Sequence, residues 1–431
     1  MAASPRGQRL AIVGTGIAGL TAAWLLRDEH AVTVFEADER IGGHGHTVDV
    51  EADGARHAVD TGFMVFNEAS YPLFTRLLRH LGVATDPTRL SFSVQSARTG
   101  LEYGSASIGA LFAQRSNMMR PSFHRMLFDM ARFAREAPGS AAETGAGPTA
   151  GTGGAGPTLG EFLAARHYSR PFIDNYIVPI GAALRSAVPR RLLDTPALPF
   201  VTFVHHHGFL IPRMRRGWRV VSGGARRYVE PLAAPFRDRV RLRTPVRRVR
   251  RRAGGVEIAT DAGTERFDAL ILATHADQSL GLLADPSPDE RDILGAIPFQ
   301  ANDVVVHTDP ALLPRHRAAW SAVNYRAPEG DGGPAQVTYL MNVVHGLRTP
   351  SPLCVTLNRM LEVDSDRLLR RHVHHHPVFN AGAPAAQRRL AAINGRDRTY
   401  YCGAWTGDGF QEDGVASAVT VGRLLGRDLP A

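Results

Sequence analysis

The sequence of 431 residues contains no lysine, and all 50 of its basic residues are arginines. A Schiff-base lysine, a lysine general base and the lysine of a phosphate-binding P-loop are therefore excluded. Only two cysteines occur, Cys354 and Cys402, far apart and without the spacing of metal ligands. We therefore expect no disulfide framework, and this cysteine usage suits a reducing compartment.

Long apolar segments are also absent from the sequence. No run of about 18 apolar residues occurs, so we expect no segment that spans a membrane. Residues 1–9 are polar and lack the apolar core of a secretory signal. A cytoplasmic protein is therefore expected. Its hydrophobic content of 44% supports a sizeable core, and its formal net charge is +9.

A glycine-rich turn between a strand and a helix is the most informative motif in the chain. The apolar run Leu10–Val13 leads directly into Gly14-x-Gly16-x-x-Gly19 and the helical stretch 20–27. The first glycine permits the tight turn, the second lets the backbone approach a pyrophosphate, and the third lets the helix pack close to the strand. The helix N-terminus then directs free N–H groups toward the phosphates. The residues expected at a dinucleotide are Gly14, Gly16, Ile17, Ala18 and Gly19.

An acidic residue after the next predicted strand narrows the choice of nucleotide. The strand 31–35 is followed by Glu36, 22 residues after Gly14, where an acid accepts hydrogen bonds from the ribose hydroxyls of adenosine. A carboxylate at this position disfavours a 2′-phosphate and hence NADP. NAD and FAD are equally compatible with these two motifs.

A second glycine pair, Gly42-Gly43, lies just beyond the ribose acid and allows the chain to fold back over the same pyrophosphate. The stretch 36–47 resembles the double-glycine signature of the FAD enzymes related to monoamine oxidase, protoporphyrinogen oxidase and phytoene desaturase. In those enzymes an arginine often follows the pair, where this chain has His44. Segment 59–63 is similar to the family segment that passes close to the flavin ring. The resemblance implies FAD contacts at Ala37, Arg40, Gly42, Gly43, His44, Thr47, Gly62 and Phe63.

Two distant stretches carry the same resemblance. Residues 244–273 contain a hairpin pattern, and in the related flavoenzymes the backbone at the position of Val246 holds adenine. Residues 401–414 form a glycine-rich loop that opens a helical stretch and so provides a second anion site. In the family its amides face the ribityl chain and the pyrimidine edge of the flavin. The resemblance adds Val246, Gly403, Asp413, Gly414 and Val415 to the expected FAD site. No second complete GxGxxG occurs, so NAD(P)H as a second substrate stays open.

These motifs predict an α/β fold in which a Rossmann-like FAD-binding domain carries an inserted α+β substrate domain, as in amine-oxidase-like two-domain flavoproteins. The FAD domain is expected to be discontinuous, at 1–95, 215–285 and 385–431, with the substrate domain at 96–214 and 286–384. Residues 138–157 are rich in Gly, Ala, Thr and Pro, which predicts a flexible surface linker.

Apolar and basic side chains are interleaved in the stretch 108–135. Phe123, Met126, Leu127, Met130 and Phe133 recur at helical spacing, which favours a core-facing amphipathic helix with solvated arginines. The alternative is a basic amphipathic helix that touches an anionic membrane surface.

Arginines also occupy every second position from Arg237 to Arg243, which predicts one face of a strand. A solvated outer face is the favoured interpretation, and anionic phospholipid headgroups are the functional alternative. Nucleic-acid binding is not expected, because no aromatic stacking platform accompanies these arginines.

Histidines form two clusters, at 205–207 and 372–376. Consecutive histidines on an extended segment point to opposite faces and cannot all bind one ion, so no metal site is predicted. His207 is a weak candidate for an acid or base that faces the flavin. Glu412 is expected to orient the flavin loop, with proton transfer as the weaker alternative. Beyond these two candidates the sequence does not identify catalytic residues.

Nearly the whole chain, apart from the linker, is similar to a narrower group of bacterial FAD-dependent amine-oxidase-like proteins that are often encoded beside cyclopropane-fatty-acid synthases. The matching stretches include 60–67, 90–94, 376–379 and 409–414, the last with Gln411 where the group usually has a histidine. The leading hypothesis is an FAD-dependent oxidoreductase that transfers hydride on an unsaturated or modified fatty acyl chain, by desaturation, saturation or double-bond isomerisation.

Two alternatives stay open. Flavin amine or amino-acid oxidation is the first, although amine oxidases of this superfamily usually place a lysine that holds water against the flavin, and this chain has none. The second is a non-catalytic FAD-binding partner of a lipid-modifying enzyme. The expected partners are a hydrophobic small molecule or fatty acyl substrate, a lipid-modifying enzyme and an anionic membrane surface at the inner face, with no nucleic acid.

Overall fold

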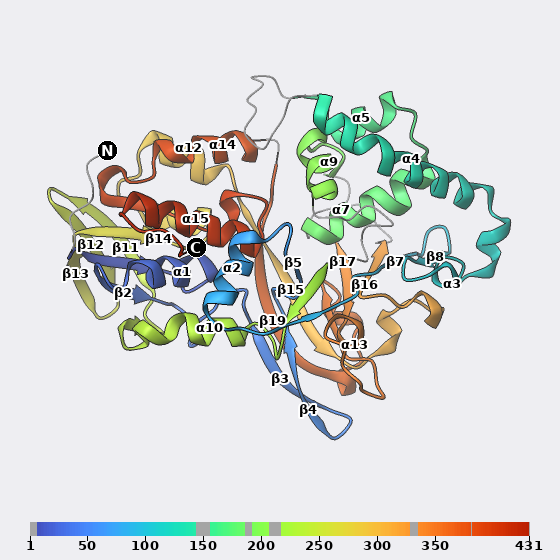
Figure 1. The fold of residues 1–431 in the computed structure, drawn as a ribbon, viewed down its shortest axis with the longest axis horizontal. Coiled ribbons are helices and arrows are strands. Elements are labelled where there is room, and N and C mark those ends of the chain that lie inside the picture. Colours follow the sequence, from blue (N-terminus) through green and yellow to red (C-terminus); the bar gives the residue numbers. More distant parts are fainter. Residues whose placement is uncertain are drawn as a thin grey trace.

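A parallel five-stranded sheet forms the centre of one lobe of the molecule (Figure 1). In spatial order its strands are β10 (Val240–Arg241), β2 (Ala31–Phe35), β1 (Arg9–Val13), β14 (Ala269–Leu272) and β20 (Thr399–Tyr401). Every neighbouring pair runs parallel. The computed structural model describes residues 7–143, 156–185, 192–206, 217–327, 335–380 and 382–430.

Successive side chains of the central strand enter two different cores. Leu10 and Ile12 of β1 pack toward helices, whereas Ala11 and Val13 pack toward a second, antiparallel sheet. The helices on the first face are α1 (Ile17–Leu26), α2 (Pro72–His80), α10 (Arg226–Ala233) and α15 (Gln411–Leu424). The strands of the antiparallel sheet are β11 (Val246–Arg252), β12 (Gly255–Thr260) and β13 (Gly263–Phe267). Because both faces are covered, the parallel strands are continuous apolar runs.

The second lobe is built on a seven-stranded sheet with the order β19-β15-β18-β17-β16-β7-β8. Its strands are β7 (Phe92–Ser96), β8 (Leu101–Gly104), β15 (Phe299–His307), β16 (Val323–Ala327), β17 (Gln336–Leu340), β18 (Cys354–Leu357) and β19 (Leu368–Pro377). Helices α4 (Pro121–Glu143), α5 (Leu159–Ala165), α6 (Arg170–Phe172), α7 (Val178–Arg185) and α9 (Ala197–His206) lie above this sheet in Figure 1. The two lobes confirm the predicted α/β fold with an α+β second part. Strand β7 begins at Phe92, so the chain enters the second sheet earlier than the predicted boundary at residue 95.

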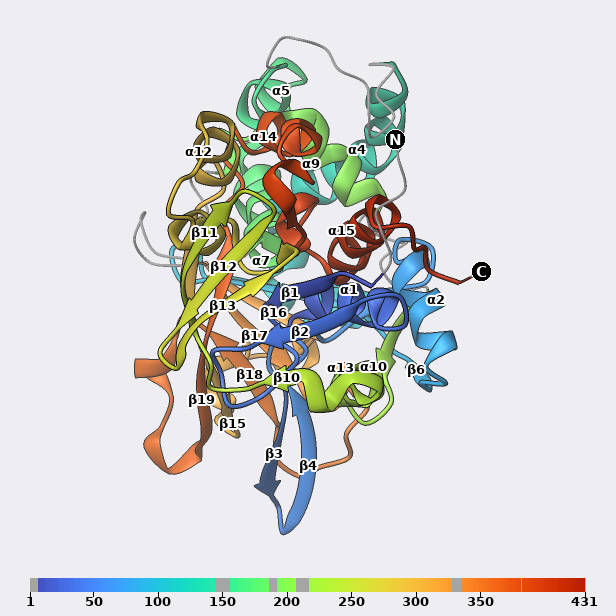
Figure 2. The same cartoon turned by 90° about the vertical axis from the view of Figure 1, so that its left-hand side faces the viewer.

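Smaller elements connect and flank the two lobes. A hairpin of β3 (Thr47–Ala52) and β4 (Ala55–Asp60) projects from the molecule in Figure 2. Strands β5 (Phe66–Asn67), β6 (Thr85–Pro87) and β9 (Trp218–Val221) form a separate small sheet. The remaining helices are α3 (Ile108–Leu111), α11 (Ala276–Leu282), α12 (Pro288–Gly295), α13 (Met341–Val344) and α14 (Ala383–Arg389).

Helix α4 resolves two of the sequence-based expectations. Phe123, Met126, Met130 and Phe133 are buried and Leu127 is partly buried against the same core, so the regular apolar stripe faces the core and is not the membrane face of a basic helix. The helix also continues to Glu143, into the range 138–157 predicted to be a linker, although Pro138 and Gly139 are poor helix formers. Residues 144–155 of that range lie outside the described residues. Within the described ranges, none of the helices is both long and apolar enough to cross a membrane.

The prediction of one long arginine-bearing strand is wrong. Ala234–Arg239 form a 3₁₀ helix with a proline in its first turn, and only Val240–Arg241 are extended. The arginines lie at the surface and pair with acids, Arg241 with Glu265 and Arg243 with Glu39. These ion pairs agree with a solvated outer face.

Candidate cofactor and substrate cavity

A cavity of about 720 Å³ lies where the two lobes meet. It is lined by the β1–α1 turn, the end of β2, the start of β11, the loop before α15, and residues of the second lobe. Segments that are far apart in the sequence thus converge at one place, as the resemblance implies. The predicted cofactor residues that line the cavity are Gly14, Gly16, Ile17, Ala18, Glu36, Ala37, Gly43, His44, Gly62, Phe63, Val246 and Gly403.

Three glycines shape the first turn, each for a different reason. Gly14 has a φ of +100°, which favours glycine, and an added Cβ would lie 2.8 Å from the carbonyl oxygen of Ala273. An added Cβ at Gly19 would lie 2.0 Å from the carbonyl oxygen of Gly14, so helix and turn are in close contact. At Gly16, by contrast, a Cβ would meet no atom of the described residues within 4 Å. The space in front of Gly16 is therefore the cavity itself, at the N-terminus of α1, where a pyrophosphate fits.

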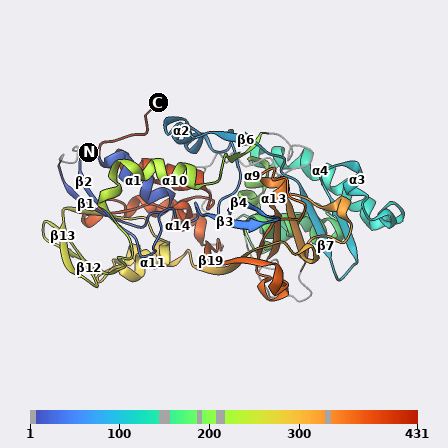
Figure 3. The same ribbon diagram turned by 90° about the horizontal axis from the view of Figure 1, so that it is seen from below.

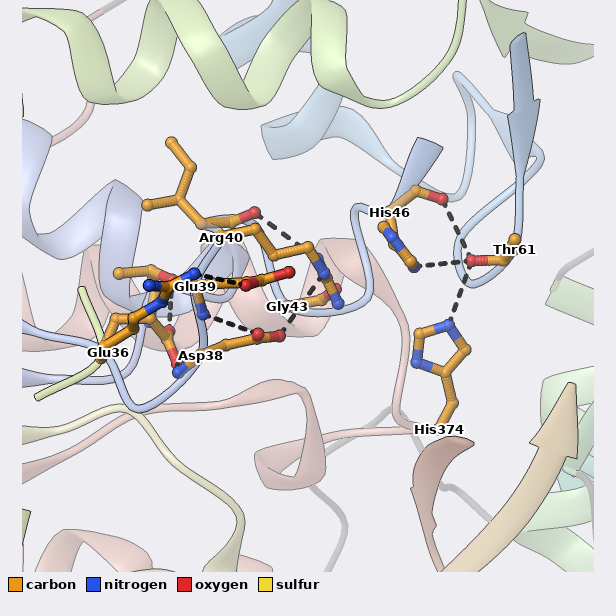
Figure 4. A network of polar contacts seen from close by, with 11 residues as sticks. Glu36, Asp38, Glu39, Arg40, Gly43, His46, Thr61 and His374 are labelled. Atoms are coloured by element: carbon orange, nitrogen blue, oxygen red, sulfur yellow. Dashed lines mark hydrogen bonds and ion pairs between the residues drawn. The ribbon is translucent and has the colours of Figure 1, made fainter. Parts of the chain in front are cut away.

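Glu36 stands at the end of β2, on the cavity wall (Figure 4). Its carboxylate accepts a hydrogen bond from the backbone N–H of Thr15, at 2.9 Å, and another from the Thr15 hydroxyl. The other carboxylate oxygen accepts from the N–H of Asp38 at 2.9 Å. These bonds fix the side chain beside the glycine turn, with the charge placed where ribose hydroxyls would donate.

The second glycine pair packs directly on the first turn. The N–H of Gly42 donates to the carbonyl oxygen of Thr15 at 3.0 Å, and an added Cβ at Gly43 would lie 3.0 Å from the Cα of Gly16. Arg40 stabilises the backbone of this glycine pair, because its guanidinium donates to the carbonyl oxygen of Gly43 at 3.0 Å (Figure 4). Burial lowers the pKa of Arg40. Arg40 therefore clamps the backbone that borders the cavity.

His44 follows the glycine pair and faces the cavity as a buried, neutral group. Burial lowers its pKa to about 4, and the neighbouring His275 adds to the effect. The backbone of His375 hydrogen bonds to the ring, while its Nε2 has no partner among the described residues. A buried polar atom without a partner carries a free-energy cost. His44 lines the cavity at the position where related enzymes often have arginine.

A group of histidines behind His44 was missed by the sequence analysis. The ring centroid of His44 lies 4.9 Å from that of His374, and His46 lies 4.5 Å from His372. The hydroxyl of Thr61 lies 2.9 Å from Nδ1 of His46 and 3.2 Å from Nε2 of His374 (Figure 4). Burial lowers the pKa of His46 to about 3 and that of His374 to about 2.

All of these imidazoles are uncharged at neutral pH, so they pack against one another without repulsion. His374 belongs to β19, whose alternate residues share one face, as predicted for an extended segment. The only sequence signal for the group is the spacing of His372, His374 and His376, because their partners lie more than 300 residues earlier in the chain. No set of three or more potential ligands within the described ranges is arranged to hold a metal ion.

The C-terminal loop before α15 forms another part of the cavity wall. Its indole, Trp405, donates to the carbonyl oxygen of Thr274 at 3.1 Å, and the N–H of Gly403 donates to the Ser417 hydroxyl at 2.9 Å. Asp413 accepts from the N–H of Phe410 at 2.9 Å. Burial raises the pKa of Asp413 to about 7, with a contribution from the nearby Asp408.

Seven of the predicted cofactor residues lie behind the cavity wall. They are Gly19, Arg40, Gly42, Thr47, Asp413, Gly414 and Val415. An added Cβ at Gly414 would lie 2.5 Å from Cγ2 of Ile17, so this glycine lets α15 pack against α1, and Val415 is fully buried in the same core. The hydroxyl of Thr47 donates to Asp60 at 2.6 Å and accepts from the N–H of Arg226 at 3.0 Å. Contacts of these residues to FAD stay a prediction.

The two weak catalytic candidates have different outcomes. Glu412 accepts hydrogen bonds from the N–H groups of Leu73 and Phe74, at 3.0 and 2.9 Å, and so caps the N-terminus of α2. This contact leaves the carboxylate away from the lining of the cavity, and a proton-transfer role gains no support. His207 lies outside the described residues, directly after helix α9, in which His205 and His206 are helical rather than extended.

Apart from His375 and His376 of β19, the second lobe contributes mainly apolar side chains to the cavity. The apolar walls include Met64, Val65, Leu90, Phe92, Ile180, Ala183, Leu184, Val323, Tyr339 and Leu357. Among the described lining residues the only carboxylates are Glu36 and Asp408, and none is an arginine. A long apolar group fits this half of the cavity, whereas a substrate carboxylate would find no cationic partner on its described walls.

Comparisons with known proteins place these observations in a family. The family model of flavin-containing amine oxidoreductases matches residues 17–313. A stretch of 77 residues is 42% identical to an L-amino-acid oxidase from Siganus canaliculatus, covering 18% of this chain and 14% of that protein.

Two solved structures share the fold over almost the whole chain. Wild-type putrescine oxidase bound to putrescine is 16% identical with a TM-score of 0.69, covering 97% of this chain and 98% of the other. A CLA-producing fatty acid isomerase from P. acnes is 17% identical with a TM-score of 0.64, covering 96% and 98%. At this level of identity the likeness concerns the fold.

Proposed function

This chain belongs to the family of flavin-containing amine oxidoreductases, with FAD as its cofactor, and on that premise we propose that it is an oxidoreductase acting on fatty acyl chains. The reaction class is hydride transfer on an unsaturated or modified acyl chain, by desaturation, saturation or double-bond isomerisation. The observation that carries the proposal is the apolar half of the cavity, which adjoins the dinucleotide half.

One half of the cavity would bind the cofactor, and the other half would bind the acyl chain. Glu36 and the two glycine turns hold the ADP part of the cofactor, and the loop before α15 borders its other end. FAD, when bound, supplies a hydride acceptor or donor. The walls at Phe92, Ile180 and Leu357 bind methylene groups and exclude water, so that one C–H bond is held in a fixed place.

Amine or amino-acid oxidation is less well supported by the same cavity. The chain lacks the lysine that the family usually uses for amines, and no described lining residue is an arginine that would pair with the carboxylate of an amino acid. An apolar substrate needs few polar side chains, which agrees with the walls of the second lobe. One solved structure with the same fold is named as a fatty acid isomerase, which also supports an acyl substrate.

The test compares substrate classes on the purified, FAD-loaded protein. Phospholipids with oleoyl or cyclopropane acyl chains, putrescine, cyclohexylamine and L-amino acids are each added without oxygen. Flavin absorbance reports net reduction, and mass spectrometry of the acyl chains detects a double-bond shift that leaves the flavin oxidised. Turnover of an acyl chain is the expected result. Reduction by amines or amino acids but not by lipids would overturn the proposal, and no turnover together with tight binding to a lipid-modifying enzyme would favour a non-catalytic role.

A pair of variants connects turnover to the cavity. Ala183 is buried on the apolar wall, and Ala183→Phe would fill acyl space while leaving Glu36 and Val246 untouched. We expect lipid turnover to fall while FAD binding is kept. The matched control is Ala164→Phe, on an exposed position of α5 in the same lobe, which should leave turnover unchanged. Equal turnover in both variants would place the substrate elsewhere.

A further inference from the structure

Exposed apolar side chains gather at one end of the molecule. Across the described residues, six large apolar side chains are exposed, and four of them fall between residues 108 and 128. They are Ile108, Met118, Met119 and Phe128, which we call the methionine patch. Met119 is the most exposed of the four, at 85%. The other two, Leu361 and Val373, are isolated from it in sequence.

The methionine patch is distinct from the apolar face that α4 uses for folding. That face carries Phe123 and Met126 and is buried in the main core, whereas Phe128 lies on the opposite, exposed side. The supporting structure is firm, because Phe112 at the end of α3 packs on Phe123 with ring centroids 5.7 Å apart. His124 of α4 also bonds the carbonyl oxygen of Met118 at 2.8 Å. The backbone that carries the exposed side chains is therefore held in place.

Positive charge surrounds this surface. No acidic residue occurs between positions 103 and 128, where Arg115, Arg120 and Arg125 stand. The first acid beyond them, Asp129, is fully buried and paired with Arg125 and Arg132. The 3₁₀ turn Arg317–Ala319 packs against α3 and adds the exposed side chain of Arg317.

From this combination we propose that the methionine patch docks on the surface of an anionic lipid bilayer. Figures 1 and 3 show α3 and the start of α4 at the end of the molecule, where a flat surface can reach them. Apolar side chains enter the acyl boundary while arginines bind headgroup phosphates, and this pairing is characteristic of interfacial binding. A second copy of the chain is a poorer occupant, because a symmetric contact would bring the same arginines together. The inference holds whatever the substrate is.

The test is co-sedimentation of the FAD-loaded full chain with lipid vesicles. Vesicles of phosphatidylcholine alone are compared with vesicles that also contain phosphatidylglycerol, at low and high salt. We expect binding only to the anionic vesicles, weakened by salt. Met118→Ser with Met119→Ser should weaken binding more than about tenfold. Each of Arg115→Ser and Arg120→Ser should weaken it about fivefold.

The matched control is Leu361→Ser, because Leu361 is 95% exposed but lies outside the patch. This control should bind vesicles like the parent protein, and flavin content with thermal unfolding verifies that each variant is folded. The proposal is overturned by an absence of binding, by equal binding to uncharged vesicles, or by full binding of the double methionine variant. A patch-dependent dimer without vesicle binding would assign the surface to self-association. Turnover of detergent-dispersed lipid is measured separately, so that a failure of docking is distinguished from a failure of the proposed chemistry.

Discussion

Gly16→Ala separates cofactor binding from folding more sharply than any other single change. Gly16 is the N-cap of α1 with φ of −63° and ψ of 176°, a conformation that alanine adopts readily. An added Cβ meets no described atom within 4 Å. The substitution restricts the unfolded chain, which stabilises the protein by about 0.4–1 kcal/mol, and this gain is offset because alanine is a poorer N-cap than glycine, by about 1 kcal/mol. The free energy of unfolding of the apoprotein should therefore change by less than about 1 kcal/mol.

FAD binding should respond quite differently, because the new methyl group projects into the cavity at the phosphate position. Overfilling a well-packed contact costs about 1–3 kcal/mol, which corresponds to a dissociation constant about 5- to 150-fold higher. Titration of apoprotein with FAD, followed by flavin fluorescence, measures the change directly. Thermal unfolding of the same apoprotein gives the change in stability.

Gly19→Ala is the matched contrast in the same motif. Its Cβ would lie 2.0 Å from the carbonyl oxygen of Gly14 and 3.1 Å from the Cβ of Ala273, and neither atom can move without moving the sheet. We expect a loss of about 3 kcal/mol or more in the free energy of unfolding, in the apoprotein as well as the holoprotein. If Gly16→Ala binds FAD as tightly as the wild type, Gly16 does not face the phosphates. If Gly19→Ala is as stable as the wild type, Gly19 is not needed for the close packing of α1 on the turn.

Three further predictions concern charged groups. Glu36→Gln should raise the dissociation constant for FAD about 10- to 150-fold, because charged hydrogen bonds to ribose are lost, and an unchanged titration would argue against this role. Glu290→Ala should lower the free energy of unfolding by about 1–3 kcal/mol in denaturant titrations, since the largely buried Arg251 loses its two bonds to Glu290 and keeps only its contacts with Asp285. Burial raises the pKa of Glu290, but hydrogen bonds from Arg251 outweigh this effect, so the pKa is lowered overall. The stability that the ionised Glu290 contributes is therefore present above the pKa of an unfolded glutamate, and it should be lost as the pH falls below about 4.3. Burial and the nearby Asp408 raise the pKa of Asp413 to about 7. Between about pH 4 and 7 the folded chain therefore keeps a proton on Asp413 that the unfolded chain has lost. The free energy of unfolding should fall as the pH rises through this range. Asp413→Asn should flatten this profile in thermal unfolding, and an unchanged profile would contradict the assignment.

Features specified by a few neighbouring residues were predictable from the sequence. The strand, glycine turn and helix around Gly14 follow from local backbone requirements, and Glu36 follows from its spacing after the turn. The buried stripe of α4 follows from helical periodicity, because four apolar residues repeat on one face.

Features specified by distant partners were not predictable in this way. Nothing near His44 in the sequence indicates that its ring will meet His374, because β19 reaches it only through the assembly of both lobes. Thr47 lies within the matched motif, yet its hydroxyl is taken by Asp60 across the hairpin. The regular arginine spacing after α10 predicts a strand, but a proline in the first turn favours the 3₁₀ helix.

The strand order of the five-stranded sheet also determines when the cofactor can be bound during synthesis. The glycine turn at β1 is made first, but β20 and α15, which complete the sheet and pack against α1, lie at residues 399–424. Contacts of such long range form late in folding. While the ribosome is still making the second lobe, the apolar faces of β14 and α1 are exposed, and they are candidate binding sites for chaperones. Cofactor loading must therefore follow completion of the polypeptide, and the supply of FAD should influence how much of the newly made chain escapes aggregation.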